Sequence, residues 1–290
     1  MKPIILYGCE IWGSFNTLAA RFRNGLTSID KVYPKLICEK LHMKMCKYIL
    51  GVHKRCTNFS VLSELGRFPL HFDIIKQMFS YWHHLENLGP SFPLLKAAYV
   101  TSKFNFHQNR SSWYGSIDFL SRITNTQHIF NQNMNAFKTN CKSALKLHYI
   151  KSWEISRQLQ NGGKLQTYIT FKQNFGLEKY LLLIPFEQRK NITKLRTSSH
   201  RLEIECGRYQ NIPRQERICR KCVLNEVEDE VHFLFNCPFY HPKRELLHSK
   251  ISTVCPKFTN LNDGNKLIWL MNVEDIPVLL AMSSLISQSL

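Results

Sequence analysis

Residues 219–237 read CRKCVLNEVEDEVHFLFNC and contain four residues at metal-ligand spacing, C-x2-C-x9-H-x4-C: Cys219, Cys222, His232 and Cys237. Two thiolates two residues apart can hold one ion from a tight turn. A histidine and a third cysteine on the following segment complete the tetrahedron that Zn2+ prefers. All four positions are filled by protein, so the spacing predicts one structural zinc ion with no open position for water. The alternative is a pair of free cysteines that lie near a core histidine.

The segment between the two ligand pairs, residues 223–231, has almost no bulky apolar side chain and carries Glu226, Glu228, Asp229 and Glu230. Such a segment has little to bury, so we expect a metal ion to organise it. The acidic run itself is expected to be an exposed loop or the start of a helix. The residues that follow, 233–235 and 238–240, are mostly aromatic or apolar and are expected to contribute core.

Charge is the second strong feature of this sequence. The formal net charge is +18 and the pI is near 9.5, from 39 Lys and Arg against 21 Asp and Glu. Such a field favours a polyanionic partner, nucleic acid first and an acidic membrane surface second. Ten basic residues against three glutamates lie within 189–222, just before and inside the metal motif. A solvated helix face is the alternative explanation for part of this run.

Length and composition are those of an ordinary globular protein, with 290 residues and 44% hydrophobic content. Seven of the ten cysteines lie outside the metal motif without paired spacing, which indicates a reducing intracellular compartment, nuclear or cytoplasmic, rather than a secreted protein. The apolar run at the N-terminus is too short for a signal peptide. Residues 276–290 are apolar but fall short of the roughly 20 residues that span a bilayer, so we expect no membrane segment.

Helical periodicity dominates, and the sequence predicts a mainly α class. In the first expected helix, 35–50, the apolar residues Ile37, Leu41, Met45 and Ile49 recur at intervals of four. Gly89, Pro90 and Pro93 mark residues 88–106 as a connection and a domain boundary. The other expected helices are 57–66, 71–88, 112–121, 133–160, 164–173, 177–183, 185–197, 239–252 and 265–287.

Motifs that would indicate catalysis are absent from the sequence. It contains no Asp-Asp pair for two-metal phosphoryl transfer, no Gly-rich phosphate loop, no His-Glu-x-x-His and no Gly-x-Ser-x-Gly. We therefore expect neither catalysis by this chain alone nor a small-molecule substrate.

Four motifs in order carry a resemblance to a known family. They are LYGCEIWG at 6–13, EKLHMKMCKYILGV at 39–52, ELGRFPL at 64–70 and LRTSSHRLEIECGRY at 195–209, the last followed by the Cys3His motif and CPFY at 237–240. Together they resemble the reverse transcriptase polyproteins of non-LTR retrotransposons of the LINE type.

The resemblance implies the region downstream of the polymerase palm. The implied parts are a thumb-like helical domain at 1–88, a helical connector at 89–185, a basic segment with a zinc knuckle at 186–245, and C-terminal helices at 246–290. In the family the thumb holds the template–primer duplex, and the knuckle region grips element RNA or target DNA. The palm and its paired aspartates lie upstream in the family and are absent here, as is an endonuclease domain. The resemblance thus implies a non-catalytic fragment or remnant that binds RNA or DNA backbone and, in its parent polyprotein, adjoins the polymerase region.

Residue by residue, the four metal ligands match the family's knuckle, and Arg196, Ser198, Ser199, His200 and Arg201 match the basic stretch before it. Hydroxyl and guanidinium groups suit phosphate oxygens. The expected nucleic-acid contacts are Arg189, Lys190, Lys194, Arg196, Ser198, Ser199, His200, Arg201 and Arg208, with Lys40, Lys44 and Lys47 on the first helix.

Several alternatives stay open. Residues 198–200 would also suit helix capping and local packing, and the three lysines would also suit a solvated face. For the whole chain, the alternative function is a zinc-stabilised helical protein-interaction domain or an inert retroelement remnant. Salt-sensitive binding of nucleic acid separates these interpretations.

Overall fold

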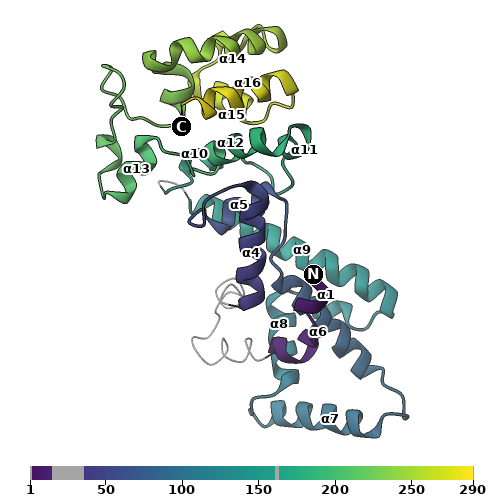
Figure 1. The fold of residues 1–290 in the computed structure, drawn as a ribbon. Coiled ribbons are helices and arrows are strands. Elements are labelled where there is room, and N and C mark those ends of the chain that lie inside the picture. The colour runs from purple at the N-terminus through teal and green to yellow at the C-terminus, as the bar shows by residue number, and fades with distance from the viewer. Residues whose placement is uncertain (1, 15–35, 161–162, 290) are drawn as a thin grey trace. The chain divides into compact units, whose positions relative to one another are not determined.

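The computed structural model describes residues 2–14, 36–160 and 163–289, and these are mainly helical (Figure 1). The described part of the chain contains no strand, only two isolated antiparallel bridges, Leu65 with Leu177 and Ile218 with Val227. The expected mainly α class is therefore confirmed.

The helices follow the chain in this order: α1 (Lys2–Ile5), α4 (Ile37–Leu50), α5 (Asn58–Glu64), α6 (His71–Glu86), α7 (Pro93–His107), α8 (Trp113–Ile123), α9 (Met134–Gln158), α10 (Gln166–Phe171), α11 (Tyr180–Leu183), α12 (Phe186–Arg196), α13 (Glu203–Tyr209), α14 (His241–Val254), α15 (Asp263–Met271) and α16 (Ile276–Ser287). Short 3-10 helices cover Gln127–Ile129, Arg214–Glu216, Pro238–Tyr240 and Phe258–Asn260, and His232–Asn236 forms one turn of π-helix.

The chain divides into two compact units. Unit 1 comprises residues 1–43 and 68–152, and unit 2 comprises residues 44–67 and 153–290. Two of the divisions fall inside α4 and α9, and the third falls between α5 and α6. The four-part organisation with boundaries at 88, 185 and 245 stays a prediction.

Unit 1 is built around α6, which buries Phe72, Ile75, Phe79 and Trp82 along one side. Helix α8 packs against both α6 and α7. The first turn of α6 has no side-chain cap of its own. Instead, the buried carboxylate of Glu39 accepts hydrogen bonds from the backbone N–H groups of Leu70 and His71, each at 3.1 Å. These donors would otherwise be unpaired at a helix start.

Unit 2 has α16 at its centre, packed against α12 and α14, and α10 packs against α15. Helix α16 is largely buried because it is apolar on most sides. Among the described residues no single helix has both the length and the apolar composition to cross a bilayer. Helices α15 and α16 have the required length and apolar composition only when taken together, and the pair is bent by 109°.

The buried face of α4 is not the one that the apolar spacing indicated. Ile37 is 85% and Leu41 40% exposed. The residues that α4 buries are Glu39, His42, Met43, Cys46 and Leu50. The first buried residue of α4 is polar because the Glu39 carboxylate accepts hydrogen bonds from the N–H groups at the start of α6. Hydrophobic periodicity does not detect such a role.

Two other expectations were wrong in detail. Residues 88–106 were expected to be a connection, yet α7 occupies most of them, and Pro93 stands in its first turn, where proline is tolerated. The single helix expected at 265–287 is broken between α15 and α16. Asp275 caps the start of α16 by accepting a hydrogen bond from Val278 N–H at 3.0 Å.

Candidate functional site

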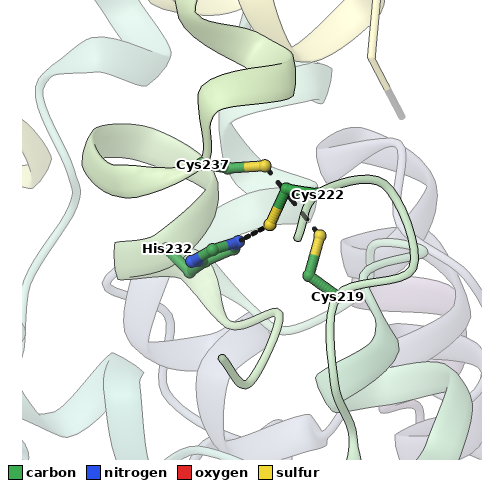
Figure 2. Close-up of side chains that lie close together, drawn as sticks. All are labelled: Cys219, Cys222, His232 and Cys237. Atoms are coloured by element: carbon green, nitrogen blue, oxygen red, sulfur yellow. Dashed lines mark hydrogen bonds between the residues drawn. The ribbon is translucent and has the colours of Figure 1, made fainter. Parts of the chain in front are cut away.

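The Cys3His motif forms a compact group of side chains in unit 2 (Figure 2). A bridge between Ile218 and Val227, together with a 2.8 Å hydrogen bond from Cys219 N–H to the carbonyl of Glu226, closes a short hairpin. Cys219 stands at the base of this hairpin, and Cys222 lies in the turn that follows. The hairpin thereby brings the first two thiols to one side of the site.

The other two ligands lie at the two ends of the π-helical turn. Asp229 starts this turn, because its carboxylate accepts hydrogen bonds from the N–H groups of Val231 at 3.0 Å and His232 at 2.9 Å. Cys237 N–H donates to the carbonyl of His232 at 2.8 Å and ends it. Between them, the buried side chain of Phe233 packs edge-to-face against Tyr240, with ring centroids 4.9 Å apart. Apolar packing therefore holds this ligand pair in place.

The spacing of the four donor atoms fits one tetrahedral ion. All four lie within 4.8 Å of one another, with 3.9 Å between the sulfurs of Cys219 and Cys237 and 3.4 Å between Cys222 Sγ and His232 Nε2. Zn–S bonds of about 2.3 Å and Zn–N bonds of about 2.0 Å at the tetrahedral angle require separations of about 3.8 Å and about 3.5 Å. Cys219, His232 and Cys237 are buried and Cys222 is half-buried. The group can hold one metal ion and leaves no ligand position for substrate.

A carboxylate orients the histidine. Glu226 Oε2 lies 2.9 Å from His232 Nδ1, so Nδ1 donates to it and Nε2 faces the thiols. Metal-binding histidines usually carry such a partner, which fixes the tautomer and the ring direction. Burial raises the pKa of the Cys219 thiol to about 12 and also raises that of Cys237. A divalent cation overrides this effect, because it deprotonates a coordinating thiol.

The acidic run was expected to be an exposed loop or the start of a helix. Glu226 is exposed and Asp229 begins a helical turn, whereas Glu228 and Glu230 are buried. Glu228 is 2% and Glu230 3% exposed. Glu228 accepts hydrogen bonds from Glu203 N–H at 2.9 Å and from the hydroxyl of Tyr240 at 3.3 Å. These two carboxylates tie the ligand-bearing segment to the rest of unit 2, so the segment has internal contacts beyond the metal ligands.

Arg196, an expected phosphate contact, is fully buried. Its Nε and Nη2 atoms form a two-pronged ion pair with Glu64, at 2.9 and 3.0 Å, and Nη2 lies 2.8 Å from Glu178. Its Nη1 donates to the carbonyl of Met271. Burial alone would lower the pKa of Arg196, but the charges of Glu64 and Glu178 outweigh burial and raise it. The guanidinium has no free face for a nucleic acid, so the expectation that Arg196 contacts phosphate was wrong.

Two further expected contacts point inward at Glu230. Ser198 is buried in the left-handed conformation (φ 50°), and its hydroxyl donates to the Glu230 carboxylate at 3.5 Å. His200 Nε2 lies 3.0 Å from the same carboxylate, with 1% of its side chain exposed. Burial would raise the pKa of Glu230, but its hydrogen bond with His200 lowers it overall. Ser198 and His200 therefore take part in local packing, which was the alternative left open for residues 198–200.

Other expected contacts differ in how far their charges are neutralised. Arg189 donates to the carbonyl of Leu181 at 2.5 Å, and Arg208 pairs with Glu205 at 2.7 Å. Lys40 and Lys44 are exposed, and Lys47 is half-buried with Nζ 2.9 Å from the carbonyl of Lys54.

Lys190, Lys194 and Arg201 are here called the basic face; Lys190 and Lys194 are half-buried and Arg201 is exposed. Burial first, and then the charges of Lys190 and Arg201, lower the pKa of Lys194, so both of these cations lie within electrostatic reach of Lys194. Glu187 pairs with Lys190 at 2.5 Å. Arg201 is exposed, and no carboxylate of the described residues forms an ion pair with it. The basic face is therefore only partly neutralised.

No protein-family model, curated protein or solved structure matches this chain.

Proposed function

We propose that this chain is a non-catalytic nucleic-acid-binding region of a non-LTR retrotransposon reverse transcriptase, stabilised by one structural zinc ion. The observation that carries the proposal is the basic face, in which the charges of Lys190 and Arg201 both act on Lys194, in the same unit as the Cys3His group. Mutual repulsion between the cations opposes such an arrangement, and the negative phosphates of a polyanion relieve it. Binding also releases counterions that were condensed on those phosphates.

Zinc is the ion that the donor set favours. Three thiolates and one imidazole at tetrahedral separations are typical of structural zinc, and harder cations such as Mg2+ and Ca2+ prefer oxygen ligands. The ion would join the hairpin of residues 218–227 to the π-helical turn that carries His232. Its role is to fix the segment that follows the basic face, and it supplies no chemistry to a substrate.

Support for the family comes from the sequence motifs alone. Their order, with the Cys3His group after the stretch 195–209, matches the region beyond the palm. The paired aspartates that hold catalytic metal ions are missing from the sequence, so we propose that binding, and not polymerisation, is what this chain contributes.

The test is salt-dependent binding. Fluorescence anisotropy with structured RNA and with duplex DNA should show affinity that falls linearly with salt on a log–log scale, by about 0.9 per phosphate contact on the duplex. The variant Lys194→Gln/Arg201→Gln should bind every sequence more weakly and reduce that slope by up to about two units. The control is Lys250→Gln/Lys257→Gln, which removes the same charge from exposed lysines in and after α14. No binding at low salt, or identical behaviour of the two variants, would contradict the proposal.

A second candidate is a protein-interaction domain, which one surface feature favours. An open pocket of about 380 Å3, with more apolar than polar lining, includes Phe235, Ile251 and Phe258. Such pockets accept apolar side chains of partners. Absence of nucleic-acid binding at low salt would favour this second candidate.

A further inference from the structure

A polar pocket of about 170 Å3 lies in unit 2, and none of the four candidate metal ligands lines it. Its lining consists of His53, Arg55, Cys56, Lys164, the turn at 198–200, and Glu205 and Tyr209 of α13. Small-molecule sites usually enclose about 300 Å3 or more. This pocket is smaller and open to solvent, and its lining is mostly polar, so it suits a compact polar group that belongs to a larger ligand.

The charges around the pocket favour an anion. Arg55 and Lys164 line it, and the only carboxylate in the lining, Glu205, is already engaged by Arg208 at 2.7 Å and by Lys164 at 3.7 Å. Lys47 lies within electrostatic reach, because its pKa is lowered by burial and also by the charge of Lys164. Cations thus outnumber carboxylates here, and a phosphate would accept hydrogen bonds from guanidinium, ammonium and hydroxyl donors.

An aromatic side chain borders the same pocket. Tyr209 is 53% exposed, and the guanidinium carbons of Arg208 and Arg55 lie 4.5 and 5.7 Å from its ring centroid. Both guanidinium groups lie over the ring, and the part of Tyr209 that they leave exposed, together with their own planes, offers a flat surface on which any base can stack. Bases in a duplex are already stacked on their neighbours, so this surface can engage only an unpaired base.

We infer that the pocket binds one phosphate of a single-stranded segment of RNA or DNA, and that the adjoining unpaired base stacks on Tyr209. The inference rests on the proposed function and refines it. It assigns Arg55, Lys164 and Tyr209, which lie outside the basic face, and it adds a preference for unpaired nucleotides. Arg55 and Lys164 position the phosphate, Ser199 adds a hydroxyl at the rim, and Tyr209 supplies the contact that a duplex cannot make.

The experiment uses the full chain and a short single-stranded oligonucleotide that contains 2-aminopurine, whose fluorescence falls when the base stacks. Binding should quench the fluorescence. Tyr209→Leu should remove the quenching and weaken binding by about 5- to 140-fold, the equivalent of 1–3 kcal/mol for one stacked base. Tyr209→Phe, which retains the ring, should behave as the original protein. Because Tyr209 is half exposed, neither variant should change the thermal unfolding midpoint.

The phosphate contacts are tested by salt dependence. Each cation that neutralises a phosphate of a single strand contributes about 0.7 to the log–log slope, so Arg55→Gln/Lys164→Gln should make that slope shallower by up to about 1.4. Lys250→Gln/Lys257→Gln again controls for overall charge. Nucleic-acid binding that responds to the Lys194/Arg201 variant but not to any pocket variant would overturn this inference and leave the proposed function intact. Absence of all binding at low salt would overturn both.

Discussion

Replacing Arg196 should destabilise unit 2 rather than weaken a nucleic-acid contact. The side chains of Arg196 and Glu64 are both 0% exposed, and the guanidinium lies between the rings of Phe171 and Tyr180, 4.7 and 5.1 Å from their centroids. Arg196→Met keeps much of the volume but leaves the Glu64 carboxylate buried without its counter-charge. The hydroxyl of Tyr180, 2.7 Å from Glu64, is then its principal remaining donor.

The magnitude of the destabilisation follows from the Glu64 carboxylate, which stays buried without its counter-charge. Removing one partner of a buried ion pair costs about 3–5 kcal/mol, because the other charge stays in a low-dielectric interior. In a unit of this size each kcal/mol lowers the unfolding midpoint by about 2–4 °C, so Arg196→Met should lower it by about 6–20 °C. An exposed phosphate contact would instead leave the midpoint almost unchanged.

Thermal unfolding followed by far-UV circular dichroism is the assay, with Arg201→Gln as the matched control on an exposed arginine. The double variant Arg196→Met/Glu64→Met should recover much of the stability, because it removes the stranded carboxylate, while Glu178 retains Lys172 as a partner. If Arg196→Met kept the original midpoint and bound nucleic acid more weakly, the buried ion pair would be the wrong account and Arg196 would return to the set of phosphate contacts.

Four other outcomes are expected. Cys222→Ser should lose the zinc ion, measured by native mass spectrometry of protein purified without added metal, and should loosen the region after about residue 215 while unit 1 stays folded; a folded, metal-free original protein would contradict the site. Glu226→Gln should weaken zinc affinity by about 10- to 100-fold in a chelator competition, because His232 loses its carboxylate partner. Burial lowers the pKa of His71 to about 4, below its unfolded value near 6.5, so the unfolded state binds more protons between these values. Stability should therefore fall by up to about 3 kcal/mol as pH drops from 6.5 to 4, and His71→Gln should flatten this dependence in urea unfolding. The purified chain should not incorporate deoxynucleotides on a primed template, and metal-dependent incorporation would refute that expectation.

The metal group could be predicted from sequence because its information is local. Four ligands within 19 residues, at spacings that turns can close, leave few ways to arrange them. The role of Arg196 could not be predicted in this way. Its partner Glu64 lies 132 positions earlier in the chain, and nothing in the run of basic residues distinguishes a buried arginine from an exposed one.

Helix positions were largely predictable, whereas the buried side of a helix was harder to assign. In α4, apolar residues occupy more than one face, so spacing alone favoured Ile37 and Leu41, and the hydrogen bonds of Glu39 decide otherwise. Signals for α7 and for the break before α16 were present in the sequence. Pro93 at a helix start, and Asp275 followed by Pro277, are both N-terminal signatures.

The turn between α12 and α13 gives the basic stretch two roles that sequence alone cannot separate. Ser198 and His200 hold the turn against Glu230, and the left-handed backbone at Ser198 reverses the chain so that Arg201 faces solvent. Under the proposed function, a change at Glu230 would therefore weaken nucleic-acid binding by disturbing the fold, whereas a change at Arg201 would weaken it directly. Measuring affinity and unfolding midpoint on the same variants distinguishes the two effects. Substitutions of inward-facing residues should lower both quantities, and substitutions of outward-facing residues should lower affinity alone.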